Sequence, residues 1–314
     1  MSLQTRRLGQ TGLTPTVLSM GCAWLGRQRG GDLAGIQAVR RAWEHGITFF
    51  DTDPGYAGGR SEPLLGQALS AFPRDSFYLS TKVGTRPGQT GDFSARGVRL
   101  SVEESLRVLG TDFLDLLLIH DPADIEPPFV PGAAVDEMCR MKEEGLIHAI
   151  GLGCRPHRFH VRAIQSGKVD VVLTFKDCTL LNQSAISDTV PLACLHQVGV
   201  ILASVLDIGF LSGERPDAVK APRAYAMWEW AREHGKSIRD FALRFAVRLP
   251  IPGMVLAGPA TREQVDQDIR SATTPISTEL WQEFENAFGV SPDSAARELA
   301  MRKEQLAGGG TVAG

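Results

Sequence analysis

Four residues whose side chains can exchange or stabilise a proton stand at or just beyond the ends of short apolar runs. Asp51 ends "ITFFD" (47–51), Lys82 ends "FYLSTK" (77–82), His120 ends "FLDLLLIH" (113–120), and Tyr56 follows Asp51 by five residues. A buried lysine needs an opposite charge, which Asp51 supplies, and a nearby ammonium lowers the pKa of a phenol from its usual value of about 10. The pattern therefore predicts Tyr56 as a general acid or base, with His120 orienting the substrate oxygen.

These residues need a scaffold that brings strand ends together. Apolar runs of strand length lie at 16–22, 47–51, 77–82, 113–120, 148–153, 169–175, 198–204 and 253–258. Segments with apolar residues at helical spacing separate them, for example 33–46 and 94–110. Strands buried on both faces that alternate with helices predict a parallel sheet, and eight such units predict a single α/β (β/α)8 TIM barrel. The carboxyl ends of barrel strands meet at one mouth, so we expect all four side chains there.

Two additions to the simple barrel are expected. Residues 5–15 read as a short N-terminal β-hairpin that could plug the bottom of the barrel. Residues 223–235 and 237–249 read as extra helices after the seventh strand, and further helices are expected at the C-terminus. We expect residues 1–306 to form one domain and residues 307–314, which are rich in glycine, to be disordered.

Composition narrows the class of protein. Lys plus Arg total 33 against 36 Asp plus Glu, a formal charge of -3, which gives no general attraction to nucleic acid or to an anionic membrane. No segment has the roughly 18 apolar residues of a membrane span, and the five cysteines form no C-x-x-C pair. We expect a cytoplasmic protein with a small-molecule substrate. Cys154, His157 and His160 are spaced like metal ligands, but Pro156 and the lack of a fourth ligand argue against a metal site.

Several ordered motifs resemble the aldo-keto reductase family. They are "FDTDPGYAGGRSEPLLGQAL", "LSTKVG", "LLLIHDP" and "EGLIHAIGLG", and the similarity runs from "TRRLGQTGLTPTVLSMG" to "GPATREQVDQDI". "FKDCTLLNQSA" and "GFLSG" resemble the bacterial branch that oxidises aldoses such as D-threo-aldoses and L-fucose, with pyridoxal dehydrogenases nearby. The resemblance implies a catalytic tetrad of Asp51, Tyr56, Lys82 and His120, with Tyr56 and His120 contacting the substrate while hydride passes to or from NAD or NADP.

The resemblance also implies a set of cofactor contacts, with departures from the family pattern. Ala203 stands where many members have an aromatic residue that stacks on the nicotinamide, and Cys154 or Arg155 where an Asn is usual. Phosphate groups should meet the loops after the seventh and eighth strands and a helix that Thr261 caps. Asp268 favours NAD, unless Arg262 accommodates the phosphate of NADP. The expected cofactor-binding residues are Gly21, Cys22, Asp51, Cys154, Ser204, Leu206, Gly258, Thr261, Gln264 and Asp268.

Some alternatives stay open. Asp53 reads first as a cap of the turn "DPGY", and second as a carboxylate close to a sugar hydroxyl or to Lys82. Trp24 could line the substrate pocket or lie on its rim. For the whole chain, the leading hypothesis is an NAD(P)-dependent oxidoreductase acting on an aldose or a small aldehyde or alcohol. A nucleotide-sensing regulatory barrel with little turnover is the alternative, and a phosphate-binding isomerase is a third.

Overall fold

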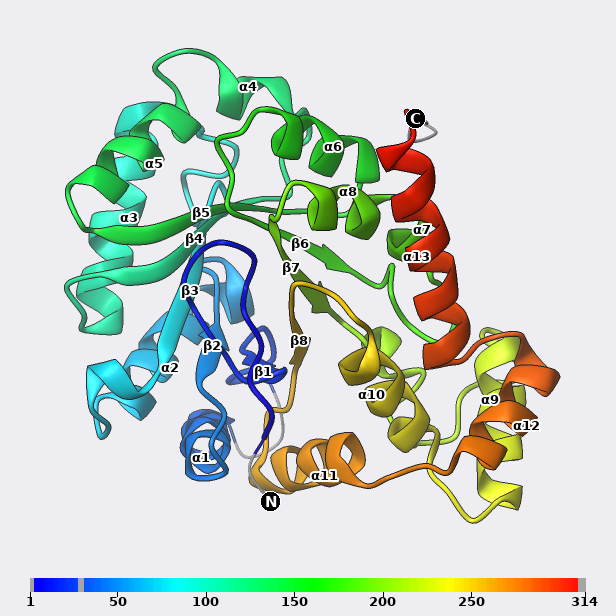
Figure 1. Ribbon diagram of the computed structural model, residues 1–314. Coiled ribbons are helices and arrows are strands. Elements are labelled where there is room, and N and C mark those ends of the chain that lie inside the picture. Colours follow the sequence, from blue (N-terminus) through cyan, green and yellow to red (C-terminus); the bar gives the residue numbers. More distant parts are fainter. Residues whose placement is uncertain (1–2, 28–30, 310–314) are drawn as a thin grey trace.

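Eight parallel strands form a closed barrel in the computed structural model, which describes residues 3–27 and 31–309 (Figure 1). Consecutive strands pair along the chain, and the last strand closes on the first with Leu18 opposite Val255. The predicted fold is therefore confirmed, and every strand lies within two residues of its predicted ends. The strands are β1 Leu18–Gly21, β2 Phe49–Asp51, β3 Tyr78–Val83, β4 Leu114–His120, β5 Ile147–Gly153, β6 Val171–Phe175, β7 Gly199–Ala203 and β8 Gly253–Ala257.

Helices surround this barrel on the outside (Figure 1). Ser94 caps the start of α3 by accepting a hydrogen bond from the Gly97 N–H, and Gly110 ends the helix in a left-handed conformation. The α-helices are α1 Gly31–Glu44, α2 Ser61–Leu69, α3 Ala95–Leu109, α4 Glu126–Phe129, α5 Ala134–Glu143, α6 His157–Gln165, α7 Ser184–Ser187, α8 Thr189–Leu195, α9 Pro222–Glu233, α10 Ile238–Arg248, α11 Arg262–Thr273, α12 Thr278–Phe288 and α13 Pro292–Ala307. Short 3-10 turns occur at η1 Tyr56–Gly58, η2 Arg74–Ser76 and η3 Asp207–Gly209.

The N-terminal hairpin covers the bottom of the barrel, as predicted. Its two arms are joined by backbone hydrogen bonds from Arg6 to Pro15 and from Leu8 to Leu13, each 3.0 Å long. The Leu8 side chain has no exposed surface and packs among the apolar residues of the barrel interior. Gly199 makes room for it, because a Cβ atom at that position would lie 2.9 Å from the Leu8 side chain. In Figure 1 the dark-blue segment passes in front of the strands.

Side chains that point into the barrel change in character from the bottom to the mouth. Successive residues of a strand point to opposite faces, so Asp51 follows Phe49 on the inner face and His120 follows Leu116 and Leu118. The buried inner cluster is apolar. At the mouth, β2–β4 instead carry charged or titratable groups, while β1, β5, β7 and β8 end in small residues. The inward positions there are Gly21, Asp51, Lys82, His120, Gly153, Phe175, Ala203 and Gly258.

The extra helices expected after the seventh strand are α9 and α10, and α12 and α13 follow near the end of the chain. Helix α13 continues to Ala307, and residues 310–314 of the expected tail lie outside the described residues. Leu33, the first apolar residue of the pattern 33–46 that predicts α1, is 64% exposed, so the buried face of this helix does not include it. Within the described part of the chain, no helix is both long enough and apolar enough to cross a membrane.

Candidate active site

A buried ion pair joins the ends of β2 and β3 at the mouth. Lys82 Nζ lies 2.6 Å from Asp51 Oδ2 and donates a second hydrogen bond of 2.6 Å to the Thr52 carbonyl oxygen. The other carboxylate oxygen of Asp51 accepts a hydrogen bond of 3.0 Å from Ser80. Burial disfavours the ammonium, but the negative charge of Asp51 and the proximity of Tyr56 and Asp53 raise the pKa of Lys82 above its usual value. Lys82 is therefore a fixed cation beneath the mouth.

The phenol of Tyr56 lies between Lys82 and His120. Lys82 Nζ is 4.8 Å from the centre of the Tyr56 ring, and the His120 ring meets that ring edge-on at 5.7 Å and 84°. We expected the pKa of Tyr56 to lie below its usual value because of Lys82, and this expectation was wrong. Loss of hydration outweighs the attraction of Lys82 and raises the pKa to about 12. Tyr56 is thus a protonated phenol at neutral pH.

His120 is held by a residue whose main expected role was a turn cap. Its Nδ1 atom lies 2.6 Å from Asp53 Oδ2, which also accepts a hydrogen bond of 2.5 Å from the Thr85 hydroxyl. Asp53 Oδ1 accepts a hydrogen bond of 2.6 Å from the Gly55 N–H, so Asp53 caps the turn as well. The i, i+2 spacing from Asp51 was the signal available in the sequence, since residues two apart in extended chain share a face.

The residues expected on the cofactor side of the mouth are accessible. Gly21, Ser204, Leu206, Thr261 and Gln264 are partly exposed and Gly258 is exposed, so a bound cofactor can reach them, and their contact with it stays a prediction. Thr261 caps α11 by accepting a hydrogen bond of 3.3 Å from the Gln264 N–H, so the N-terminus of this helix offers a site for a phosphate. Three residues of the β7–α9 loop, including Ser204, have positive φ angles between 48° and 53°, a strained geometry that is common at ligand sites.

Two of the residues expected to bind the cofactor are buried. Cys22 and Cys154 have no exposed surface in this structure, so the burial of their side chains does not favour a contact, and their role in cofactor binding stays a prediction. The Cys154 thiol lies 3.5 Å from His160 Nε2, and His160 Nδ1 lies 3.0 Å from the Thr189 hydroxyl. His157 Nδ1 lies 2.8 Å from the same hydroxyl. Cys154, His160 and Thr189 are thus a buried hydrogen-bonded group, which the partly buried His157 joins.

Asp268 also differs from its expected role. It is 4% exposed, and its carboxylate lies 3.3 Å from Nη1 of Arg239 in the first turn of α10. Burial raises the pKa of Asp268 to about 6, against the opposing effect of Arg239. The sequence placed this carboxylate where it would repel the extra phosphate of NADP. Because it is buried and paired, the argument for NAD from Asp268 is lost.

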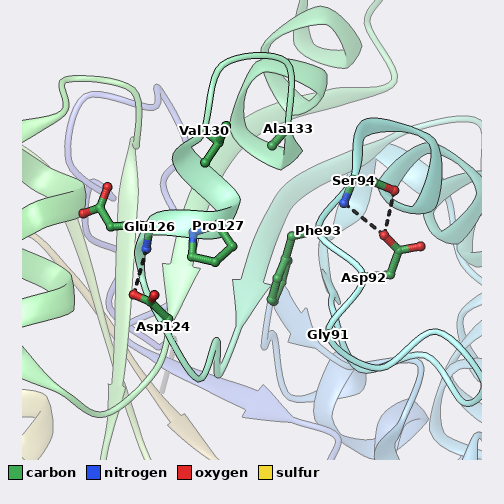
Figure 2. Close-up of a pocket in the computed structure, with 9 residues that line it drawn as sticks. All are labelled: Gly91, Asp92, Phe93, Ser94, Asp124, Glu126, Pro127, Val130 and Ala133. Carbon is green, nitrogen blue, oxygen red and sulfur yellow. Dashed lines mark hydrogen bonds between the residues drawn. The ribbon is translucent and has the colours of Figure 1, made fainter.

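Trp24 and a surface hollow lie outside the tetrad on the βα-loop face of the barrel. The Trp24 ring packs over Gly258, where an added Cβ would lie 3.1 Å from it, and it is 39% exposed, so its role in substrate binding stays a prediction. A hollow of about 550 Å³ separates the loop after β3 from α4. Figure 2 shows Phe93 and Pro127 on its two sides. None of the four tetrad residues lines this hollow.

A closed (β/α)8 barrel with a Tyr–Lys–Asp–His cluster at its mouth has the groups that proton transfer at a bound carbonyl or hydroxyl group requires. The model of the Aldo/keto reductase family matches residues 18–288, and the chain belongs to this family. It is therefore an NAD(P)-dependent oxidoreductase.

Named relatives and solved structures agree with that assignment. The chain is 31% identical to L-galactose dehydrogenase of Arabidopsis thaliana, over 90% of the chain and 92% of the relative. It is 28% identical to D-threo-aldose 1-dehydrogenase of a Pseudomonas species, over 79% of the chain and 86% of the relative. An aldo-keto reductase from Klebsiella pneumoniae, solved in complex with NADPH, has the same fold, with a TM-score of 0.74 and 22% identity over 93% of this chain and 97% of that one.

Proposed function

We propose that this enzyme oxidises an aldose, or a closely related sugar, and reduces the matching carbonyl compound in the reverse direction. The observation that carries the proposal is the convergence of Tyr56, the buried Asp51–Lys82 pair and His120 at one mouth. The aldose specificity is supported by relatives that are named as dehydrogenases of L-galactose, D-threo-aldoses and D-arabinose.

The tetrad residues divide the work of proton transfer in this proposal. A bound nicotinamide supplies the hydride donor or acceptor. Tyr56 holds the proton that the substrate oxygen gains in reduction or loses in oxidation. Lys82 stabilises the negative charge that develops on the phenol oxygen, and Asp51 keeps Lys82 in place. His120 directs a hydrogen bond to the same substrate oxygen.

For the cofactor, we propose that the site accepts both NAD and NADP. Asp268 faces Arg239 and is not free to repel the additional phosphate, while Arg262 is exposed on the first turn of α11. Fluorescence titration with NADH and with NADPH tests this directly. Dissociation constants within about tenfold of each other agree with it, since tenfold corresponds to about 1.4 kcal/mol. Binding of one reduced cofactor alone contradicts it.

The activity is tested by following NADH or NADPH absorbance with a panel of aldoses that includes L-galactose, D-arabinose and L-fucose, together with methylglyoxal and pyridoxal. Tyr56→Phe removes the proton-carrying hydroxyl with little change in shape and should lower kcat by about 100-fold or more. Tyr225→Phe, in α9 away from the mouth, is the matched control and should behave like the wild type. Cofactor binding without turnover of any substrate would favour the regulatory alternative instead.

A further inference from the structure

The buried carboxylate of Asp53 is engaged by three donors. Oδ1 accepts a hydrogen bond from the Gly55 N–H at 2.6 Å, and Oδ2 accepts from the Thr85 hydroxyl at 2.5 Å and faces His120 Nδ1 at 2.6 Å. Burial raises the pKa of Asp53, but the hydrogen bond from His120 and the charge of Lys82 outweigh burial and hold the pKa below its usual value. Asp53 is therefore ionised at neutral pH, and an ionised carboxylate can only accept hydrogen bonds.

The contact fixes which nitrogen of His120 carries the proton. Because Asp53 can only accept, the short contact at Nδ1 requires a proton on Nδ1. In the neutral ring, Nε2 then has a free lone pair, and in the charged ring Nε2 becomes a donor. Nε2 lies 3.5 Å from Asp121 Oδ2, and the Asp121 side chain is 48% exposed, so this edge of the ring points towards the open mouth.

We propose that Asp53 is a positioning residue of this enzyme: it holds His120 through Nδ1 and so presents Nε2 to the substrate oxygen. Neutral His120 accepts a hydrogen bond from the hydroxyl of a sugar that is to be oxidised, and charged His120 donates one to a carbonyl that is to be reduced. Asp51 and Asp53 thereby have similar roles, because Asp51 holds Lys82 and Asp53 holds His120 next to Tyr56. The proposal rests on the proposed function for its catalytic consequence, but not for the tautomer of His120.

The sharpest variant is Asp53→Asn, because asparagine can keep the turn. Its side-chain oxygen can still accept from the Gly55 N–H, which leaves the NH₂ group facing Thr85 and His120. A donor opposite Nδ1 favours the other tautomer, with the proton on Nε2. We therefore expect the His120 tautomer to invert and kcat/KM to fall by about 10- to 100-fold, with the dissociation constant for NADH unchanged.

Asp115→Asn is the matched control. Asp115 is also a buried carboxylate, which accepts from the Leu79 N–H at 2.8 Å and faces Arg74 at 2.7 Å, but it lies at the beginning of β4 while His120 lies at its end. This variant should keep both the His120 tautomer and kcat/KM. A loss of activity in Asp53→Asn that Asp115→Asn does not share then reports on His120 and not on the loss of any buried charge.

The tautomer is read by NMR of protein that carries isotope-labelled histidine, with the His120 signal assigned by its absence in His120→Gln. The proton on Nδ1 in the wild type and on Nε2 in Asp53→Asn supports the proposal. The proton on Nε2 in the wild type overturns it, even if Asp53→Asn does not fold. An unchanged tautomer, or an unchanged kcat/KM after inversion, also overturns it. If the wild type turns over no carbonyl substrate, the proposed function fails while the tautomer still decides the role of Asp53.

Discussion

Replacing Lys82 by methionine isolates the contribution of the buried ion pair. The Lys82 side chain is 1% exposed and that of Asp51 is 4% exposed, so water cannot take the place of either partner. Methionine has a similar length without the charge. In Lys82→Met, Asp51 keeps the hydrogen bond from Ser80 but loses the contact of 2.6 Å to the ammonium. The variant therefore leaves an uncompensated buried charge.

The expected loss follows from that geometry. Removing one partner of a buried pair costs about 3–5 kcal/mol of unfolding free energy, whereas replacing both partners by uncharged residues is often close to neutral. Asp51→Asn combined with Lys82→Met should thus recover at least about half of the loss. Urea unfolding of the wild type, both single variants and the double variant measures the coupling. The reasoning is refuted if Lys82→Met lies within about 1 kcal/mol of the wild type, or if the double variant is less stable than Lys82→Met.

Other predictions concern the cofactor side and the bottom of the barrel. Asp268 has a pKa of about 6 against 3.8 in the unfolded chain, so its stabilising protonated form is lost as pH rises through about 6. In urea unfolding at pH 7, the free energy of unfolding of Asp268→Asn should be higher than that of the wild type by up to about 3 kcal/mol. The difference should disappear below about pH 4. Phe175 is the one aromatic residue among the inward mouth positions named above. Phe175→Ala should weaken NADH binding by about two- to tenfold in a fluorescence titration. The control variant Phe113→Ala should bind NADH like the wild type. Gly199→Ala would place a Cβ 2.9 Å from the side chain of Leu8 and should lower the unfolding free energy by about 1–3 kcal/mol. A variant as stable as the wild type would contradict the close packing of the N-terminal hairpin against the bottom of the barrel.

The fold and the convergence of the four residues at one mouth could be predicted because they depend on local pattern. Each strand is a short apolar run, and parallel strands in a barrel all end at one mouth. Asp51, Lys82 and His120 mark such ends directly in the sequence. The hairpin plug was predictable for a similar reason, since a short turn with glycine before the first strand has few places to pack.

What could not be predicted depends on the direction in which a side chain points from a loop or helix. Asp268 could face the solvent or the neighbouring helix, and only the position of Arg239 decides this. Cys154 directly follows the end of β5, but its thiol is turned to the buried His160. The pKa of Tyr56 depends on two opposing effects: loss of hydration raises it and the charge of Lys82 lowers it. A sequence gives the sign of each effect but not their relative size.

The raised pKa of Tyr56 has a consequence for the direction of the reaction. A phenol with a pKa of about 12 keeps its proton at neutral pH, so Tyr56 is ready to donate a proton in reduction, and it must first lose that proton before it can accept one in oxidation. A neutral His120 held at Nδ1 by Asp53 offers an Nε2 lone pair towards the mouth, and the rings of His120 and Tyr56 are 5.7 Å apart. A catalyst cannot change the equilibrium constant of its reaction, and the dissociation constants of the cofactors are expected to stay the same. If Asp53 sets this arrangement, Asp53→Asn should therefore lower kcat/KM for sugar oxidation and for the reverse reduction by the same factor at one pH. An unequal loss would mean that the variant also changes cofactor binding, and that Asp53 does more than hold His120.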